Sequence, residues 1–222
     1  MIVAERKPFE EIKESVKQYQ RILVLGCGTC VSVCLTGGEK EVGVLASMLR
    51  MSFKLDGVEK KIGEMTVQRQ CEKEFVEPLK AVVGDYDVIL SLGCGAGVQF
   101  VADMFEEVPV VPGLNTKFIG ASGGTGTWEE VCAGCGDCVL AKTAGICPIA
   151  RCSKRLLNGP CGGSQNGRCE INPELRCAWQ MIYDRLRARG QLELLEEIMP
   201  PKSWKPALSG GPRKLVREDV MP

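Results

Sequence analysis

The sequence predicts an α/β protein in three parts: an α/β domain over residues 1–125, a cysteine-rich domain over residues 126–180, and a helix with an extended C-terminal arm over residues 181–222. Two observations predict this organisation. In the first part, short apolar segments rich in β-branched residues alternate with segments of helical periodicity, which is typical of a parallel sheet connected by helices. In the second part, eight cysteines fall between Cys132 and Cys177, where apolar periodicity is weak.

Each element of the first part follows from its own pattern. Residues 21–26 form an apolar run that ends in glycine, and residues 39–55 place apolar side chains such as Val42 and Leu45 on one helical face. Together with the remaining segments, they predict a Rossmann-like domain with a parallel sheet. The other expected strands are 61–68, 87–92 and 108–111, and the other expected helices are 8–20, 72–83 and 98–105.

The C-terminal half is expected to contain one long helix. Glycine and threonine dominate residues 122–127, where we expect the boundary between the first two domains. Residues 174–199 have helical periodicity, with a break at Gly190 as an open alternative, and two prolines follow. The tail contains three of the twelve prolines and Trp204 but has little potential to form a core. We therefore expect the tail to dock on a partner instead of folding on its own chain.

Charge and composition exclude several classes of function. The 222 residues include 28 basic and 28 acidic side chains, so the formal net charge is zero and nothing favours binding to nucleic acid or to an anionic membrane. Histidine is absent, which excludes an imidazole general base and a mixed cysteine–histidine zinc site. No apolar stretch has the length of a signal peptide or of a membrane span. We therefore expect a cytoplasmic protein whose thiols stay reduced.

The thirteen cysteines indicate metal binding or redox chemistry, because their number far exceeds what packing requires. The first group is Cys27, Cys30 and Cys34, at the end of an expected strand and on the first turn of the following helix. A tetrahedral metal site or an iron–sulfur cluster needs a fourth ligand. Cys71 and Cys94 each follow another expected strand and either could supply it; we favour Cys71.

The second group resembles the ligand run of bacterial ferredoxins, in which three cysteines at two-residue spacing precede a Cys-Pro pair. Eight thiolates suffice for two [4Fe-4S] clusters, or for one cluster and a structural zinc site with four cysteines. With the first group, the chain would hold two to three clusters, and the pairing of the eight cysteines stays open. These eight candidate ligands are Cys132, Cys135, Cys138, Cys147, Cys152, Cys161, Cys169 and Cys177.

Glycines offer a competing interpretation, in which the chain is a nucleotide-binding enzyme. Two strand ends carry Gly26-x-Gly28 and Gly93-x-Gly95, fragments of the dinucleotide-binding fingerprint. Valine stands in both cases where the fingerprint needs its third glycine, so this alternative is weak.

The cysteine-rich segment resembles a known family. The stretch from Cys147-Pro148 through Asn158-Gly-Pro-Cys-Gly-Gly163, followed by Gly167-Arg-Cys and Cys177-Ala-Trp, resembles the methylenetetrahydrofolate reductase C-terminal family. That family occurs as a cysteine-rich domain of flavin-containing methylenetetrahydrofolate reductase, or as a separate small subunit beside it in acetogenic and related anaerobic bacteria. The resemblance is specific from Cys132 to about Lys205.

The resemblance implies a function in electron transfer. The partner would be the FMN-bearing catalytic subunit of methylenetetrahydrofolate reductase, which carries out the folate chemistry, and a further protein would act as electron donor. This chain would hold [4Fe-4S] clusters between that donor and the flavin. Family descriptions also mention zinc, so a subunit that only scaffolds the complex through zinc is the alternative. The basic side chains Arg151, Lys154 and Arg155 either stabilise a reduced cluster or are only solvated.

Overall fold

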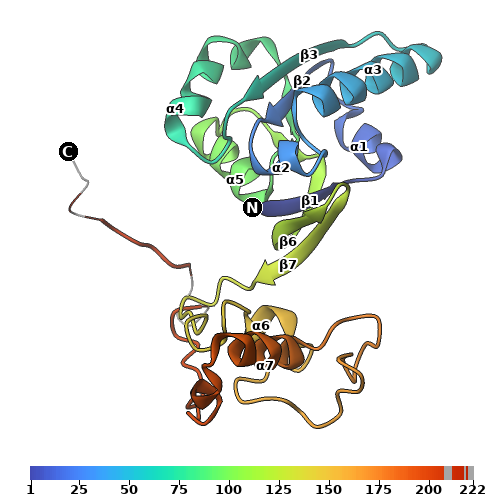
Figure 1. Cartoon of the computed structure of the whole chain (residues 1–222). Coiled ribbons are helices and arrows are strands. Elements are labelled where there is room, and N and C mark those ends of the chain that lie inside the picture. Colours follow the sequence, from blue (N-terminus) through green and yellow to red (C-terminus); the bar gives the residue numbers. More distant parts are fainter. Residues whose placement is uncertain (208–211, 218, 220–222) are drawn as a thin grey trace. The chain divides into compact units, whose positions relative to one another are not determined.

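Figure 1 shows the computed structural model, which describes residues 1–207, 212–217 and 219. The chain divides into two compact units, Met1–Trp128 and Glu129–Pro222. Within the described residues, no helix is both long enough and apolar enough to cross a membrane.

A four-stranded parallel sheet forms the centre of the first unit, which confirms the prediction of an α/β fold there. In the order of the sheet, the strands are β3 (Lys61–Val67), β2 (Arg21–Cys27), β4 (Val88–Ser91) and β5 (Val110–Pro112). Each neighbouring pair is parallel. All four carboxyl ends therefore lie along one edge, where open α/β sheets bind their ligands.

Helices bury both faces of this sheet, as the apolar run in β2 requires. Successive side chains of a strand point to opposite faces, so Ile22 and Leu23 enter different apolar clusters. The cluster of Ile22 includes side chains of α1 (Phe9–Val16) and α3 (Glu39–Leu55), and the cluster of Leu23 includes α5 (Gly95–Met104). A strand that is buried on both faces shows no polar alternation, which explains why its sequence is uniformly apolar.

The predicted helix over residues 72–83 is wrong in its extent. The segment forms one turn of α-helix, α4 (Lys73–Val76), followed by the 3-10 helices η1 (Glu77–Ala81) and η2 (Val83–Asp85). Pro78 explains the interruption, since proline has no amide hydrogen for the bond to the carbonyl four residues earlier.

A second, antiparallel sheet in the first unit was not predicted. Its order is β1-β6-β7, with β1 (Ile2–Arg6), β6 (Leu114–Gly124) and β7 (Thr127–Cys132). Only Val3 and Ala4 of β1 are buried, a pattern too short to show periodicity in the sequence. The glycine-rich residues 122–127, where we expected a domain boundary, form the end of β6, a two-residue turn at 125–126 and the start of β7, and the division between the units falls after Trp128.

The second unit contains little regular structure. Its helices are α6 (Pro148–Arg151), α7 (Ala178–Arg189) and the 3-10 helix η3 (Leu192–Leu195). The predicted helix over residues 174–199 is therefore too long, and the break at Gly190 is confirmed. Gly190 has a φ of 66°, the left-handed conformation that glycine commonly adopts at the end of a helix.

The second unit nevertheless has a small apolar core, formed mainly by the predicted helical segment after Cys177. Ile146, Trp179, Ile182 and Leu186 are buried together. The indole Nε1 of Trp179 donates a hydrogen bond of 3.0 Å to the carbonyl oxygen of Leu156, which satisfies its one polar group. The sequence conceals this core because Ile146 comes from an irregular segment, whereas the other three side chains come from α7.

Candidate functional site

Four cysteines lie at the carboxyl edge of the parallel sheet. Cys27 is the last residue of β2, and Cys30 is the first residue of α2 (Cys30–Val33). Cys71 follows β3, and Cys94 follows β4 as the residue immediately before α5. Lateral pairing of β2 with β3 and β4 thus brings together residues that are up to 67 positions apart, counted from Cys27 to Cys94.

The thiols of these four cysteines interact electrostatically. Partial burial raises the pKa of the Cys71 thiol, and the negative charges of Cys94, Cys27 and Cys30 raise it further. Four thiolates at such a place repel one another, and a bound cation or cluster removes the repulsion. The structure therefore places both Cys71 and Cys94 near the Cys27–Cys30 pair, whereas the sequence led us to expect one of them.

Cys34 does not join this group. Its side chain is buried at 3% exposure in the apolar core of the first unit. Its Sγ lies 3.9 Å from the carbonyl oxygen of Ala4, 3.7 Å from that of Val31 and 3.4 Å from the hydroxyl of Thr36. The backbone amide of Cys34 does donate to the carbonyl of Cys30, as the helical spacing predicts, but its thiol is directed into the core.

In the second unit, the loop of Cys132, Cys135 and Cys138 is held by backbone contacts. The amide of Gly134 donates to the sulfur of Cys132 at 3.4 Å, and the thiol of Cys135 lies 3.8 Å from the carbonyl oxygen of Asp137. Amide hydrogen bonds to sulfur stabilise thiolates and are a usual feature of protein-bound iron–sulfur clusters.

The C-terminal segment packs on this same loop. The ammonium group of Lys202 donates to the carbonyl oxygen of Asp137 at 2.7 Å, and its side chain is only 3% exposed. The guanidinium group of Arg213 donates to the carbonyl oxygens of Gly134 at 3.0 Å and of Pro206 at 2.7 Å. A Cβ added at Gly136 would meet Pro206 at 2.7 Å, so only glycine permits this approach.

These contacts correct our expectation that the tail does not fold on its own chain. Residues 202–207 lie against the cysteine loop, and Ala207 is buried. The physical reason is hydrogen bonding, since cationic side chains of the tail reach the carbonyl groups that the loop leaves free. Trp204 remains 46% exposed, so it stays a candidate contact for a partner. The last part of the predicted arm, including Pro222, lies outside the described residues.

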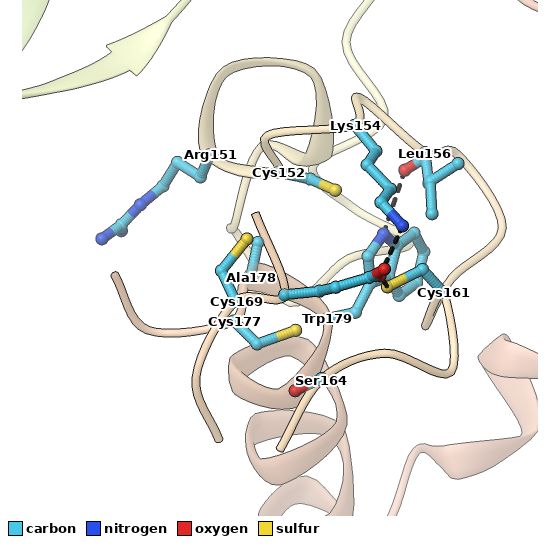
Figure 2. Close-up of a pocket in the computed structure, with 11 residues that line it drawn as sticks. Arg151, Cys152, Lys154, Leu156, Cys161, Ser164, Cys169, Cys177, Ala178 and Trp179 are labelled. Carbon is cyan, nitrogen blue, oxygen red and sulfur yellow. Dashed lines mark hydrogen bonds and ion pairs between the residues drawn. The ribbon is translucent and has the colours of Figure 1, made fainter. Parts of the chain in front are cut away.

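Four of the other five cysteines of the second unit line one pocket, which Figure 2 shows in close-up. Its four thiols belong to Cys152, Cys161, Cys169 and Cys177, with Trp179 beside them. Cys147 is not among the residues that line this pocket; it precedes α6, and Cys152 follows it. Four of the eight cysteines therefore line one pocket, whereas the pairing of the eight as ligands stays open.

Hydrogen bonds prepare one of the pocket thiols for ionisation. The hydroxyl of Ser153 lies 3.3 Å from the sulfur of Cys169 and lowers the pKa of this thiol, and backbone amides of Asn172 and Ile171 lower it further. A lower pKa increases the fraction of thiolate, the form that binds metals. We did not single out Ser153 from the sequence, although its position directly after Cys152 is visible there.

The basic residues near the pocket differ in their contacts. Lys154 forms an ion pair with Glu170, and the thiol of Cys161 also donates to this carboxylate, at 3.4 Å. Arg151 pairs with Glu129 at 3.3 Å. The Lys154–Glu170 pair therefore lies among the pocket cysteines, whereas Arg151 is engaged by a carboxylate that does not line the pocket.

No group of three or more cysteine or carboxylate side chains within the described ranges is arranged closely enough to hold a metal ion. Metal binding by the thirteen cysteines therefore stays a prediction. The donors suit a thiophilic metal or an iron–sulfur cluster, because the candidate ligands are thiols, and the hydrogen bonds around Cys169 favour its ionised form.

Fold and site together define a protein of two units, with a parallel α/β sheet in the first and a pocket lined by four cysteines in the second. Comparison with known families supports a narrower likeness: the family model described as "Methylene-tetrahydrofolate reductase C terminal" matches residues 111–205. The match spans every cysteine from Cys132 to Cys177. No curated protein and no solved structure matches the chain.

Proposed function

We propose that this chain is an iron–sulfur electron-transfer subunit of a methylenetetrahydrofolate reductase, corresponding to the small subunit called MetV. The observation that carries the proposal is the coincidence of the family match with a pocket that four of the matched cysteines line. The folate chemistry belongs to the flavin-bearing partner. Bound clusters would supply one-electron transfer, and the residues of this chain hold and tune them.

Two of the three proposed ligand sets are supported by the structure, and the third by the sequence spacing. At the sheet edge, Cys27, Cys30, Cys71 and Cys94 supply one set, and Cys34 is left out because its thiol lies in the core. The pocket of Figure 2 supplies a second set. The third set contains the ferredoxin-like run and the cysteine before proline: Cys132, Cys135, Cys138 and Cys147.

The nucleotide-binding alternative has weaker support, because valine replaces the third glycine of the fingerprint at both strand ends. The first glycines of the two fragments serve packing: a Cβ added at Gly26 would lie 2.6 Å from both Thr66 and Val42, and one at Gly93 would lie 2.5 Å from Gln70.

Zinc remains the alternative for the pocket of Figure 2, since four thiolates also suit a structural zinc site. Metal and acid-labile sulfide analysis of the anaerobically purified chain tests the proposal. We expect iron and sulfide in equal amounts and visible absorption that bleaches with dithionite. A colourless protein that contains only zinc would instead establish a scaffold.

The association with a flavoprotein requires a separate test. Co-expression with a flavin-containing methylenetetrahydrofolate reductase should give a complex that survives size-exclusion chromatography. Reduction of the clusters in that complex should then be followed by bleaching of the flavin absorption. If the flavoprotein elutes alone, the proposed partner is wrong, whatever the metal content of this chain.

A further inference from the structure

A buried glutamine lies directly before one of the sheet-edge cysteines. Gln70 is fully buried, with 0% exposure, and belongs to a small set of buried polar side chains in the described part of the chain. Its Nε2 donates a hydrogen bond of 2.9 Å to the carbonyl oxygen of Leu25, and its Oε1 accepts one of 2.6 Å from the hydroxyl of Ser91. That hydroxyl accepts a hydrogen bond of 3.1 Å from the amide of Gly93.

These bonds connect the three strand ends that carry the four cysteines. Leu25 is two residues before Cys27 in β2, and Gln70 is adjacent to Cys71 after β3. Ser91 ends β4, and the amide that it accepts from belongs to the residue before Cys94. One side chain therefore connects the segment after β3, beyond its last paired residue Val67, to Leu25 and Ser91, which are paired with each other in the ladder of β2 and β4.

The glycines around Gln70 show that this arrangement is tightly packed. A Cβ at Gly93 would lie 2.5 Å from the Gln70 carboxamide oxygen, and one at Gly97 would lie 2.8 Å from its Cβ. The start of α5 can thus approach only because both positions lack a side chain. Since a buried carboxamide is costly without partners, Gln70 and its hydrogen-bonding groups hold one another in a single arrangement.

We propose that Gln70 is a positioning residue for a metal centre formed by the sheet-edge cysteines, an inference that rests on the proposed function. It acts through the backbone, by holding the segment after β3, which carries Cys71, at a fixed distance from the ends of β2 and β4. Outer residues that orient ligands in this way typically contribute a factor of about 10–100 to metal retention.

The test compares full-length chains purified anaerobically. Gln70→Met keeps the size of the side chain but removes its hydrogen bonds, and Ser91→Ala is a milder change in the same network. Gln68→Met is the matched control, because Gln68 lies two residues earlier and is exposed. Cys30→Ser defines the signal that belongs to the sheet-edge centre. The readouts are the rate of iron loss to a chelator and the electron paramagnetic resonance spectrum of the reduced protein.

The iron of the sheet-edge centre is the component that is absent in Cys30→Ser. We expect Gln70→Met to lose this component about 10–100 times faster than the unmodified chain and to show an altered electron paramagnetic resonance signal. Ser91→Ala should show a smaller change in the same direction, and Gln68→Met none. Rates and spectra of Gln70→Met and Ser91→Ala identical to those of Gln68→Met would overturn the positioning role alone. If Cys30→Ser contains as much iron as the unmodified chain, the sheet-edge centre and the positioning role both fail.

Discussion

Removing single thiols from the first unit distinguishes ligands from core residues. Replacement of Cys27, Cys30, Cys71 or Cys94 by serine should each remove about four iron atoms, the content of one [4Fe-4S] cluster. Cys34→Ala should leave the iron content unchanged, because its thiol is 3% exposed and in contact with the carbonyl oxygen of Ala4.

The same series predicts where stability is lost. Cys34→Ala removes one buried heavy atom, comparable to a methylene group whose burial contributes about 0.8 kcal/mol, and the resulting cavity brings the loss to about 1–2 kcal/mol. For a chain of 222 residues, this loss lowers the melting temperature by about 2–8 °C.

Iron and sulfide determination, together with thermal unfolding followed by circular dichroism, checks both expectations under anaerobic conditions. The thermal measurement serves as the control, since it shows whether a variant that lost iron is still folded. The reasoning is refuted if Cys34→Ala loses as much iron as Cys71→Ser, or if Cys71→Ser and Cys94→Ser both keep the full iron content.

Three further predictions concern other contacts. Lys202→Met should destabilise the second unit by about 1–2 kcal/mol and speed proteolysis of the Cys132–Cys138 loop, because it removes the hydrogen bond to Asp137. Lys205→Met is the control, because Lys205 is exposed; equal cleavage of both variants would contradict this prediction. Trp179→Ala should cost about 3–5 kcal/mol in the free energy of unfolding, measured with denaturant, because Trp179 is only 4% exposed; a loss below about 1 kcal/mol would show that it is not a core residue. Asp87→Asn should lower the melting temperature at pH 7, because hydrogen bonds from Arg21 lower the pKa of the Asp87 carboxyl. A carboxyl whose pKa is lowered in the folded state contributes stability at pH values above its unfolded pKa of about 3.9, and this stability is lost as the pH falls through the folded pKa. The difference in melting temperature between the unmodified chain and Asp87→Asn should therefore shrink below about pH 4. A difference that does not depend on pH would refute a stabilising interaction of the ionised Asp87.

Much of the fold could be predicted because the relevant patterns are local. The apolar run of β2 and the helical face of α3 lie within continuous segments, and their observed bounds, Arg21–Cys27 and Glu39–Leu55, agree with the sequence pattern. The antiparallel sheet was missed because β1 has only two buried residues and finds its partner β6 more than 100 positions later. Local periodicity contains no information about such a pairing.

For the candidate site, the sequence by itself determined the kind of donor: thirteen cysteines and no histidine leave thiolates as the characteristic soft ligands. Only the tertiary structure decided which thiols meet. Cys34 is seven residues from Cys27 yet turns into the core, whereas Cys94 is 67 positions away and joins it at the sheet edge. The physical reason is that the pairing of β2 with β4 brings the ends of these strands together, and this pairing acts between segments remote in the chain.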